Sequence, residues 1–225
     1  MSLTLFVGDY AYSSWSLRGW LLLDAFGVPF QHRYAHMRTE AFEALRRDMA
    51  PSRLVPALKI ADAEGERIVW DTLAMAETLH EMYPDAGYWP KGAAARALAR
   101  SLTAEMHSGF AALRGACPMN MRRRYAGFEV DTEVQADLER LDQLWALALD
   151  RHDQGPYLFG AFTVADAFYA PVASRIDTYD LPIGARAREY VSALLSHPSV
   201  ARWQAMALAD GHIQEHYEFD MANRA

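Results

Sequence analysis

The chain has 225 residues, 52% of them hydrophobic, and a formal net charge of −7. This length suits one large domain or two modest ones, and the negative charge argues against general binding to nucleic acid or to an anionic membrane. Because Cys117 is the only cysteine, intramolecular disulfides and cysteine-rich zinc sites are excluded. The sequence contains no apolar run of about 18 residues, the length that predicts a membrane-spanning helix, and its start lacks the pattern of a signal peptide. We therefore expect a soluble cytoplasmic protein.

Strands and helices alternate in the first third of the chain. Residues 3–7 form an apolar run typical of a buried strand, and a helix over residues 15–26 is expected to end before Gly27 and Pro29. Asp71 or Thr72 can cap the last helix of this part. The other elements predicted here are a strand over 29–34, a helix over 40–49, a hairpin of strands over 56–60 and 66–70, and a helix over 73–82.

After Gly92 the pattern is helical almost throughout. The predicted helices cover residues 93–115, 132–150, 164–178, 185–195 and 198–209. A short segment that contains Pro and Gly, residues 84–92, separates the two patterns. We therefore predict an α/β domain over residues 1–84, a linker over 85–92 and an all-α domain over 93–225.

Four motifs, in this order, carry a resemblance to a known family. They are SSWSLRGWLLLDAFGV at 13–28, PSRLVPALKI at 51–60, VWDTLAMAETLHEMYP at 69–84 and FTVADAFYAPV at 162–172. Together they resemble the glutathione transferase superfamily over nearly the whole chain, and the first is similar to the SSCSxR motif of the zeta class. The resemblance implies a thioredoxin-like domain that binds glutathione, an α-helical carboxyl-terminal domain and a homodimer.

Ser13 and Ser14 stand directly before the first predicted helix, where a serine commonly serves as the helix cap. The resemblance implies that Ser13 also activates glutathione as a thiolate, with Ser14 as its replacement or helper. A hydrogen bond to the charged sulfur contributes roughly 1.5–3 kcal/mol, and the helix amino terminus adds about 0.3–1 kcal/mol. Together they would lower the thiol pKa by roughly one to three pH units. Trp15 replaces the cysteine of the zeta motif, which argues against maleylacetoacetate isomerase activity and against cysteine-dependent thiol transfer.

The resemblance also implies the residues that hold glutathione. A cis peptide bond between Val55 and Pro56 would present the Val55 backbone to the cysteinyl part, whereas proline alone would suggest a strand breaker. Asp71 would accept the γ-glutamyl ammonium, and Thr72 would hold the γ-glutamyl carboxylate at a helix start. The expected glutathione-binding set is Trp15, Leu54, Val55, Pro56, Asp71 and Thr72.

Thr163 and Asp166 form a Thr-x-x-Asp capping box before an apolar helix. We interpret this motif as structural, because a buried helix start needs partners for its free N–H groups. Thr163→Ala is predicted to cost about 1 kcal/mol or more of stability and to leave the chemistry largely intact.

The electrophile pocket is predicted to include Tyr12, Met119, Arg122 and Tyr169. Met119 can equally be core filler. Arg122 opens a run of three arginines, which is either a solvated patch or, near the mouth of a site, an attraction for a carboxylate or phosphate. The zeta class holds substrate with a helical arginine, but Arg175 is displaced from that spacing, so this role is not transferred to it.

Residues 212–216, HIQEH, match the H-x-x-E-H pattern of some zinc proteases. We interpret them as a polar tail and predict no metal site. The function predicted from the sequence is that of a glutathione transferase acting on a small electrophile, with glutathione as co-substrate and no cofactor. The alternatives are a glutathione-dependent isomerase of the maleylacetoacetate type and a non-catalytic binding module that kept the fold.

Overall fold

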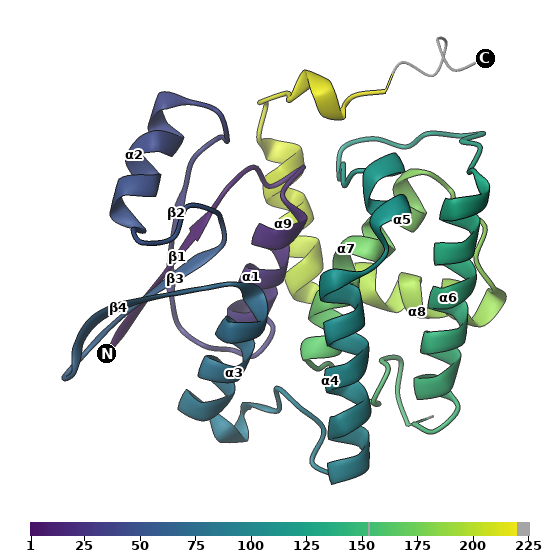
Figure 1. Ribbon diagram of the computed structural model, residues 1–225, viewed down its shortest axis with the longest axis horizontal. Helices are drawn as coiled ribbons and strands as arrows, with labels where there is room; N and C mark the ends of the chain where they lie inside the picture. Colours follow the sequence, from purple (N-terminus) through teal and green to yellow (C-terminus); the bar gives the residue numbers. More distant parts are fainter. Residues whose placement is uncertain (153, 220–225) are drawn as a thin grey trace.

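The computed structural model describes residues 1–152 and 154–219, in which a small sheet domain precedes a helical domain (Figure 1). The sheet has the order β2-β1-β3-β4. β2 runs parallel to β1, whereas β3 is antiparallel to both β1 and β4. The strands are β1 (Ser2–Val7), β2 (Gln31–Tyr34), β3 (Ala57–Asp62) and β4 (Gly65–Trp70).

The two faces of the sheet are covered by helices because side chains along a strand alternate between faces. Leu3, Leu5 and Val7 of β1 belong to the large core that also contains α1 and α3, while Phe6 joins a smaller cluster with Phe42 of α2. The helices of this domain are α1 (Ser14–Asp24), α2 (Glu40–Asp48) and α3 (Thr72–Met82). The alternating pattern predicted for the first third of the chain is therefore confirmed.

The helical domain is organised around α7, whose residues are almost all buried. α7 packs against α1 of the sheet domain as well as against α4 and α8, so one continuous core joins the two domains. The indole N–H of Trp203 on α9 donates to the Tyr10 backbone oxygen across the same boundary. The helices are α4 (Ala93–Ser108), α5 (Ala111–Ala116), α6 (Thr132–Leu149), α7 (Val164–Thr178), α8 (Ala185–Ser196) and α9 (Pro198–Ala209).

One predicted helix, over residues 93–115, is wrong, because the structure divides it into α4 and α5. Gly109 is extended and Phe110 has φ of 58°, so the helical hydrogen bonding is interrupted between them. A Cβ on Gly109 would lie 2.7 Å from the Glu105 backbone oxygen, so no larger residue fits at this bend. The break reorients α5 and brings Arg114 to the functional site described below.

The capping box and the cis bond between Val55 and Pro56 are both confirmed. Asp166 is fully buried and accepts from the backbone N–H and the hydroxyl of Thr163. A second cis bond, between Ala50 and Pro51, was not predicted. The domain limits near residues 84 and 92 stay predictions, and the last residues of the proposed second domain, 220–225, lie outside the described chain. No helix within the described residues has the length and apolar character needed to cross a bilayer.

Candidate active site

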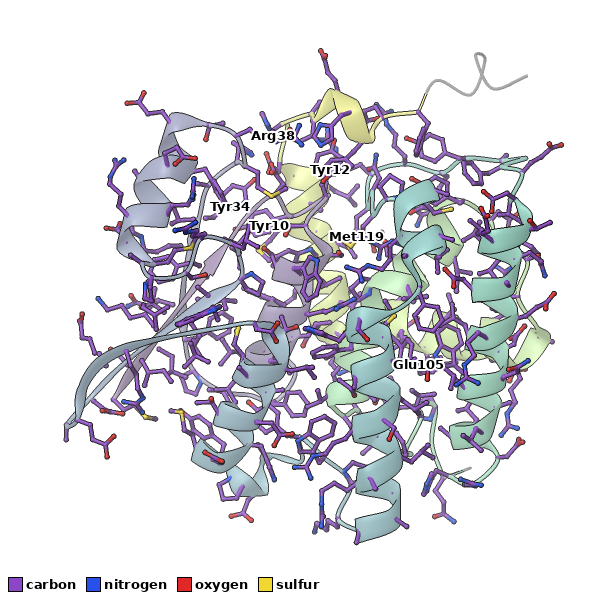
Figure 2. The ribbon with its side chains drawn as sticks, in the orientation of Figure 1. Tyr10, Tyr12, Tyr34, Arg38, Glu105 and Met119 are labelled. Atoms are coloured by element: carbon purple, nitrogen blue, oxygen red, sulfur yellow. The ribbon has the colours of Figure 1, made fainter. Side chains whose placement is uncertain are left out.

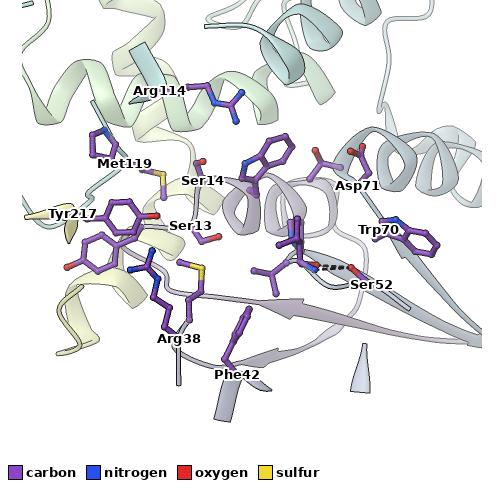
Figure 3. A pocket seen from close by; sticks show the side chains of 18 of the residues that line it. Ser13, Ser14, Arg38, Phe42, Ser52, Trp70, Asp71, Arg114, Met119 and Tyr217 are labelled. Carbon is purple, nitrogen blue, oxygen red and sulfur yellow. Dashed lines mark hydrogen bonds between the residues drawn. The ribbon is translucent and has the colours of Figure 1, made fainter. Parts of the chain in front are cut away.

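A cavity of about 860 Å³ lies where loops of the sheet domain meet the helical domain (Figure 3). The sheet domain contributes the segment before α1, the loop after β2, the loop before β3 and the start of α3. The opposite wall comes from α5, the chain that follows it, α7 and the segment after α9. Ser13, Ser14, Asp71, Arg114 and Met119 surround this space in the close-up view (Figure 3).

Ser13 and Ser14 both line the cavity but differ in their hydrogen bonding. The Ser13 hydroxyl accepts from the Ser16 backbone N–H at 3.3 Å as the cap of α1, and it donates to Ser16 Oγ at 2.8 Å. The Ser14 hydroxyl has no hydrogen-bond partner among the described residues. Ser13 must therefore rotate its O–H to reach a ligand, whereas Ser14 can donate to a ligand without losing a bond.

The loop before β3 carries three of the predicted glutathione-binding residues, Leu54, Val55 and Pro56, and all three line the cavity. Leu54 is 77% exposed, and the preceding turn is held by the Ser52 hydroxyl, which donates to the Leu54 backbone oxygen. Pro56 lies against α1 at Gly19, where an added Cβ would come within 2.7 Å of the proline ring. Because Gly19 has no side chain, the loop before β3 can pack closely against α1.

Asp71 and Thr72 meet the cavity at the start of α3. Asp71 caps the helix by accepting from the Leu73 N–H, and it does so with φ of 70°, a conformation that residues other than glycine rarely adopt. Its other carboxylate oxygen lies 3.2 Å from His107 Nε2 on α4. The Thr72 hydroxyl is buried without a hydrogen-bond partner among the described residues. A strained acid beside an unpartnered hydroxyl is the arrangement expected of a ligand-binding helix start.

His107 was not predicted as a site residue. Burial lowers its pKa, and the positive charges of Arg18 and Arg114 lower it further, although Asp71 acts in the opposite direction. The imidazole is therefore neutral near pH 7, and Asp71 keeps its negative charge uncompensated. That charge is available to an ammonium group in the cavity.

Trp15 lines the cavity and contacts two arginines. The guanidinium carbon of Arg18 lies 4.7 Å from the centre of the indole, and that of Arg114 lies 5.2 Å from it. Arg18 is fully buried, and none of its three guanidinium nitrogens has a hydrogen-bond partner among the described residues. Burial, aided by the charges of Arg175 and Arg114, lowers the pKa of Arg18 to about 9.

Arg114 and Arg175 belong to the helical-domain wall of the cavity, and no Asp or Glu lies among the lining residues of that wall. Arg175 is almost fully buried and donates to the backbone oxygens of Cys117 and Pro171. Burial, together with the charge of Arg114, lowers its pKa to about 10. Both guanidiniums remain protonated at neutral pH, so this wall has a positive charge that no described carboxylate neutralises.

Two of the four residues predicted for the electrophile pocket lie elsewhere. Arg122 donates to the backbone oxygen of His212 and so holds the chain that follows α9. Tyr169 is fully buried in α7 and donates to the Leu102 backbone oxygen. Tyr12 and Met119 do line the cavity. The four residues were predicted from their positions along the chain. Position along the chain does not determine the direction in which a side chain points.

The segment after α9, residues 210–219, runs along the top of the view in Figure 1 and contributes Tyr217 to the cavity. Tyr217 lines the cavity and stacks on Tyr12, whose hydroxyl donates to Glu218 at 2.8 Å. Burial and this bond raise the pKa of Tyr12 to about 12. Glu218 also accepts from Asn120 and Arg123, so the segment is anchored to both domains.

Comparison with known proteins identifies the sheet domain. Residues 12–82 match the family model of the glutathione S-transferase N-terminal domain. This segment is a glutathione S-transferase N-terminal domain. A probable maleylacetoacetate isomerase of Caenorhabditis elegans is 26% identical over 177 residues, which cover 78% of this chain and 80% of that protein.

Solved glutathione transferases share the fold of both domains. A Burkholderia glutathione transferase homologue with bound glutathione is 24% identical, with a TM-score of 0.68 over 93% of this chain and all of that one. A maleylacetoacetate isomerase from Anaeromyxobacter dehalogenans, with bound dicarboxyethyl glutathione and citrate, is 17% identical with a TM-score of 0.62 over 96% of each chain. The glutathione transferase architecture predicted from the sequence is therefore confirmed.

Several cavity residues of this glutathione transferase fold were missed by the sequence reasoning. No periodicity or motif marks Arg38, His107 or Arg114, and Tyr217 lies in a segment interpreted as a polar tail. Arg175 was considered, but its spacing did not match that of the family's arginine. The glycine at position 109 is a signal that could have predicted the end of α4. A helix break there determines where Arg114 points.

Proposed function

We propose that the chain is a glutathione transferase that activates the thiol of glutathione through a serine hydroxyl. The observation that carries this proposal is that three separate ligand-binding elements face one cavity. These are the Ser13–Ser14 pair at the start of α1, the backbone of Val55 before a cis proline, and the Asp71–Thr72 pair at the start of α3. The part of glutathione that each element would bind is assigned from the resemblance to the glutathione transferase family.

In the proposed reaction the Ser13 hydroxyl rotates from Ser16 towards the sulfur, and Ser14 supplies a second donor. The thiol proton leaves to solvent, and the thiolate forms a carbon–sulfur bond with an electrophile seated against the helical domain. Where the electrophile has a leaving group, that group departs with its bonding electrons. Glutathione is the co-substrate, and the reaction needs no cofactor.

We further propose that the electrophile carries a carboxylate. Arg114 and Arg175 are charged, belong to the wall opposite the serines and have no carboxylate partner among the described residues. A guanidinium binds a carboxylate through paired hydrogen bonds. The Anaeromyxobacter dehalogenans isomerase, whose fold is similar, holds a glutathione adduct that itself has carboxylates. This supports an isomerase acting on an unsaturated acid as the second candidate, although Trp15 replaces the zeta cysteine.

The serine assignment is tested by titrating glutathione into the wild type, Ser13→Ala and Ser14→Ala and following the ultraviolet absorbance of the bound thiolate. The wild type should lower the thiol pKa by about one pH unit or more, and Ser13→Ala should lose most of that shift. Binding of S-methylglutathione, which has no ionisable thiol, should stay nearly unchanged in both variants. A wild type that binds neither compound would instead favour the non-catalytic alternative.

The electrophile class is tested by comparing benzyl chloride with its para-carboxylate. The acid should be the better substrate for the wild type, and Arg114→Leu should raise its KM while leaving that of benzyl chloride unchanged. Equal KM values for the two compounds would contradict the proposed class. Product analysis with an unsaturated diacid separates the two candidate functions, because an isomerase regenerates the glutathione that a transferase consumes.

We also propose a homodimer and a cytoplasmic location, both from the family resemblance. Leu54 and Trp70 are exposed apolar residues at the edge of the cavity, 77% and 49% accessible, and so are available to a partner surface. Light scattering should give twice the chain mass, and Trp70→Glu should shift the assembly to monomers. A monomeric wild type at micromolar concentration would contradict the dimer.

A further inference from the structure

Outside the cavity, three side chains from distant parts of the chain converge. Asp9 follows β1, His36 follows β2, and His212 lies in the segment after α9. One potential ligand atom of each lies within 4.8 Å of those of the other two. The cluster lies near Tyr34 and Arg38, which flank His36 in sequence and are labelled in Figure 2 close to the segment that leaves α9. None of the three residues takes part in the function proposed above.

The contacts within this cluster are close. Asp9 is 1% exposed, and its Oδ1 lies 3.0 Å from His36 Nδ1. The imidazole rings of His36 and His212 are 3.9 Å apart between centres. The two rings are tilted by 32° to each other, and both lie beside the one buried carboxylate. One carboxylate and two imidazoles, groups that commonly bind metal ions, are therefore brought together in one place.

The surrounding groups hold the carboxylate in place. The Met37 backbone N–H donates to Asp9 Oδ2 at 2.9 Å, and the Gln214 amide donates to the same oxygen at 3.3 Å. Gln214 Nε2 also lies 3.2 Å from His212 Nε2. Outer hydrogen bonds of this kind orient the ligands of metal sites, and their loss lowers metal affinity.

We propose that Asp9, His36 and His212 bind a divalent transition-metal ion, with zinc as the best fit. Two imidazoles and one carboxylate are donors that zinc accepts in a tetrahedral site, with water at the fourth position. Zinc–ligand distances of about 2.1 Å place the donor atoms roughly 3.4 Å apart. His36 and Asp9 already meet that spacing, and a small movement of the segment that carries His212 completes it. Asp210, whose Oδ1 lies 3.7 Å from His36 Nε2, adds negative charge beside the ion.

The proposed ion is structural, because none of its three ligands is among the residues that line the cavity. It would link the segment after α9 to the sheet domain, and this segment also supplies Tyr217 to the cavity wall. The site differs from the zinc-protease pattern noted in the sequence. His216 of that pattern is not a member of the cluster, and its Nδ1 lies 3.1 Å from Arg38 Nη1.

The test uses the untagged chain, stripped of metal with a chelator and titrated with zinc by calorimetry. We expect a single ion per chain and a rise in Tm on binding. His212→Gln and His36→Gln should each weaken binding by about tenfold or more. His216→Gln is the matched control, because it removes a histidine of the same segment that is not in the cluster, and it should bind zinc as tightly as the wild type. Cobalt bound in place of zinc should show the intense visible absorption of a tetrahedral site.

Hydrogen exchange provides a readout that does not depend on catalysis. Zinc should slow amide exchange in residues 212–219 of the wild type but not of His212→Gln, which changes only the terminal segment and leaves the core intact. The inference is overturned if zinc does not bind, if His212→Gln binds it as tightly as the wild type, or if His216→Gln weakens binding equally. In the first case the hydrogen bonds of Asp9 with His36, Met37 and Gln214 would account for the cluster by themselves.

Discussion

The hydroxyl groups around the cavity have different capacities for activating a thiol. Ser13 and Ser14 lie at a helix amino terminus, where the backbone N–H groups favour a negative charge. The hydroxyl of Tyr12, which also lines the cavity, is already donated to Glu218. Because burial and Glu218 raise its pKa to about 12, this phenol is a poor source of a second hydrogen bond to sulfur.

Tyr12→Phe should therefore leave the thiol pKa of bound glutathione unchanged. The substitution removes only the bond to Glu218, so its expected cost is about 1.5–3 kcal/mol of stability, the range for a hydrogen bond to a charged acceptor. Thiolate absorbance of the bound complex and Tm measure the two effects separately. A thiol pKa that rises as far in Tyr12→Phe as in Ser13→Ala would show that the tyrosine takes part in activation.

If the chain binds glutathione as proposed, His107 should make that binding depend on pH. Its pKa lies below the ordinary value of 6.5, so it is neutral at pH 7 and gains a proton as the pH falls through the lowered pKa. The imidazolium then pairs with Asp71, 3.2 Å away, and the proposed attraction of Asp71 for the γ-glutamyl ammonium would weaken. Affinity for S-methylglutathione should therefore fall as the pH is lowered from 7 through the pKa of His107.

His107→Gln should abolish this loss, because glutamine stays neutral throughout that pH range. The thiol-blocked analogue is used so that titration of the sulfur does not contribute to the profile. An unchanged pH profile in His107→Gln would assign the dependence to another group.

At the scale of single elements, the amino terminus of α7 is held by Asp166. Burial raises the pKa of Asp166 to about 6, although hydrogen bonds from Thr163, Leu158 and Tyr190 oppose that rise. Thr163→Ala removes the hydroxyl donor at 2.9 Å and should cost about 1–2 kcal/mol, a fall in Tm of roughly 2–8 °C. Thr163→Ser keeps the donor and should lose less than half as much. If Thr163→Ala keeps its Tm but loses turnover, the structural interpretation is wrong.

The contact between α1 and the loop before β3 leads to a second prediction. In Gly19→Ala the new methyl group would lie 2.7–2.8 Å from two ring atoms of Pro56, which cannot rotate away. We expect a cost of roughly 1–3 kcal/mol and weaker glutathione binding, because Val55 moves with Pro56. Gly115→Ala in α5 is the control, since a Cβ there meets no atom within 4 Å, and it should be neutral or slightly stabilising. Equal Tm changes in the two variants would contradict the packing argument.

Most elements could be predicted from the sequence because local signals agree with the tertiary packing. The Ser13 cap and Gly27 bound α1 closely, and the period-two pattern of β1 matches the two clusters that cover it. The break at Gly109 was missed because the apolar periodicity continues across it. That periodicity reports burial, whereas the break depends on the close approach of Gly109 to the Glu105 backbone.

At the scale of the whole molecule, some walls of the cavity can be predicted from the sequence and others cannot. Its sheet-domain wall could be inferred because each contributing residue lies at the end of a strand or the start of a helix. The helical-domain wall could not, since Arg114 and Arg175 come together only through the packing of α5 against its neighbours. The position of the terminal segment was harder still to predict, because its contacts join residues more than 200 positions apart, as between Tyr12 and Glu218.

Glu218 fixes this terminal segment through its charge. Burial favours its neutral form, but hydrogen bonds from Tyr12, Arg123 and Asn120 outweigh that effect and lower its pKa below 4.5. A carboxylate whose pKa is lowered in the folded state stabilises that state above its ordinary pKa and loses this contribution as the pH falls through the lowered value. The segment should therefore stay anchored at neutral and mildly acidic pH and be released only below about pH 4.5.

Glu218→Gln should release the segment without a change of pH. Its neutral amide loses the ion pair with Arg123 and cannot accept from all three donors, so amide exchange in residues 212–219 at pH 7 should increase by about tenfold or more. Glu215→Gln is the matched control, because Glu215 lies in the same segment and forms no ion pair among the described residues; its exchange should equal that of the wild type. Equal exchange rates in Glu218→Gln and the wild type would mean that packing of Tyr217 against Tyr12 is sufficient to hold the segment over the cavity.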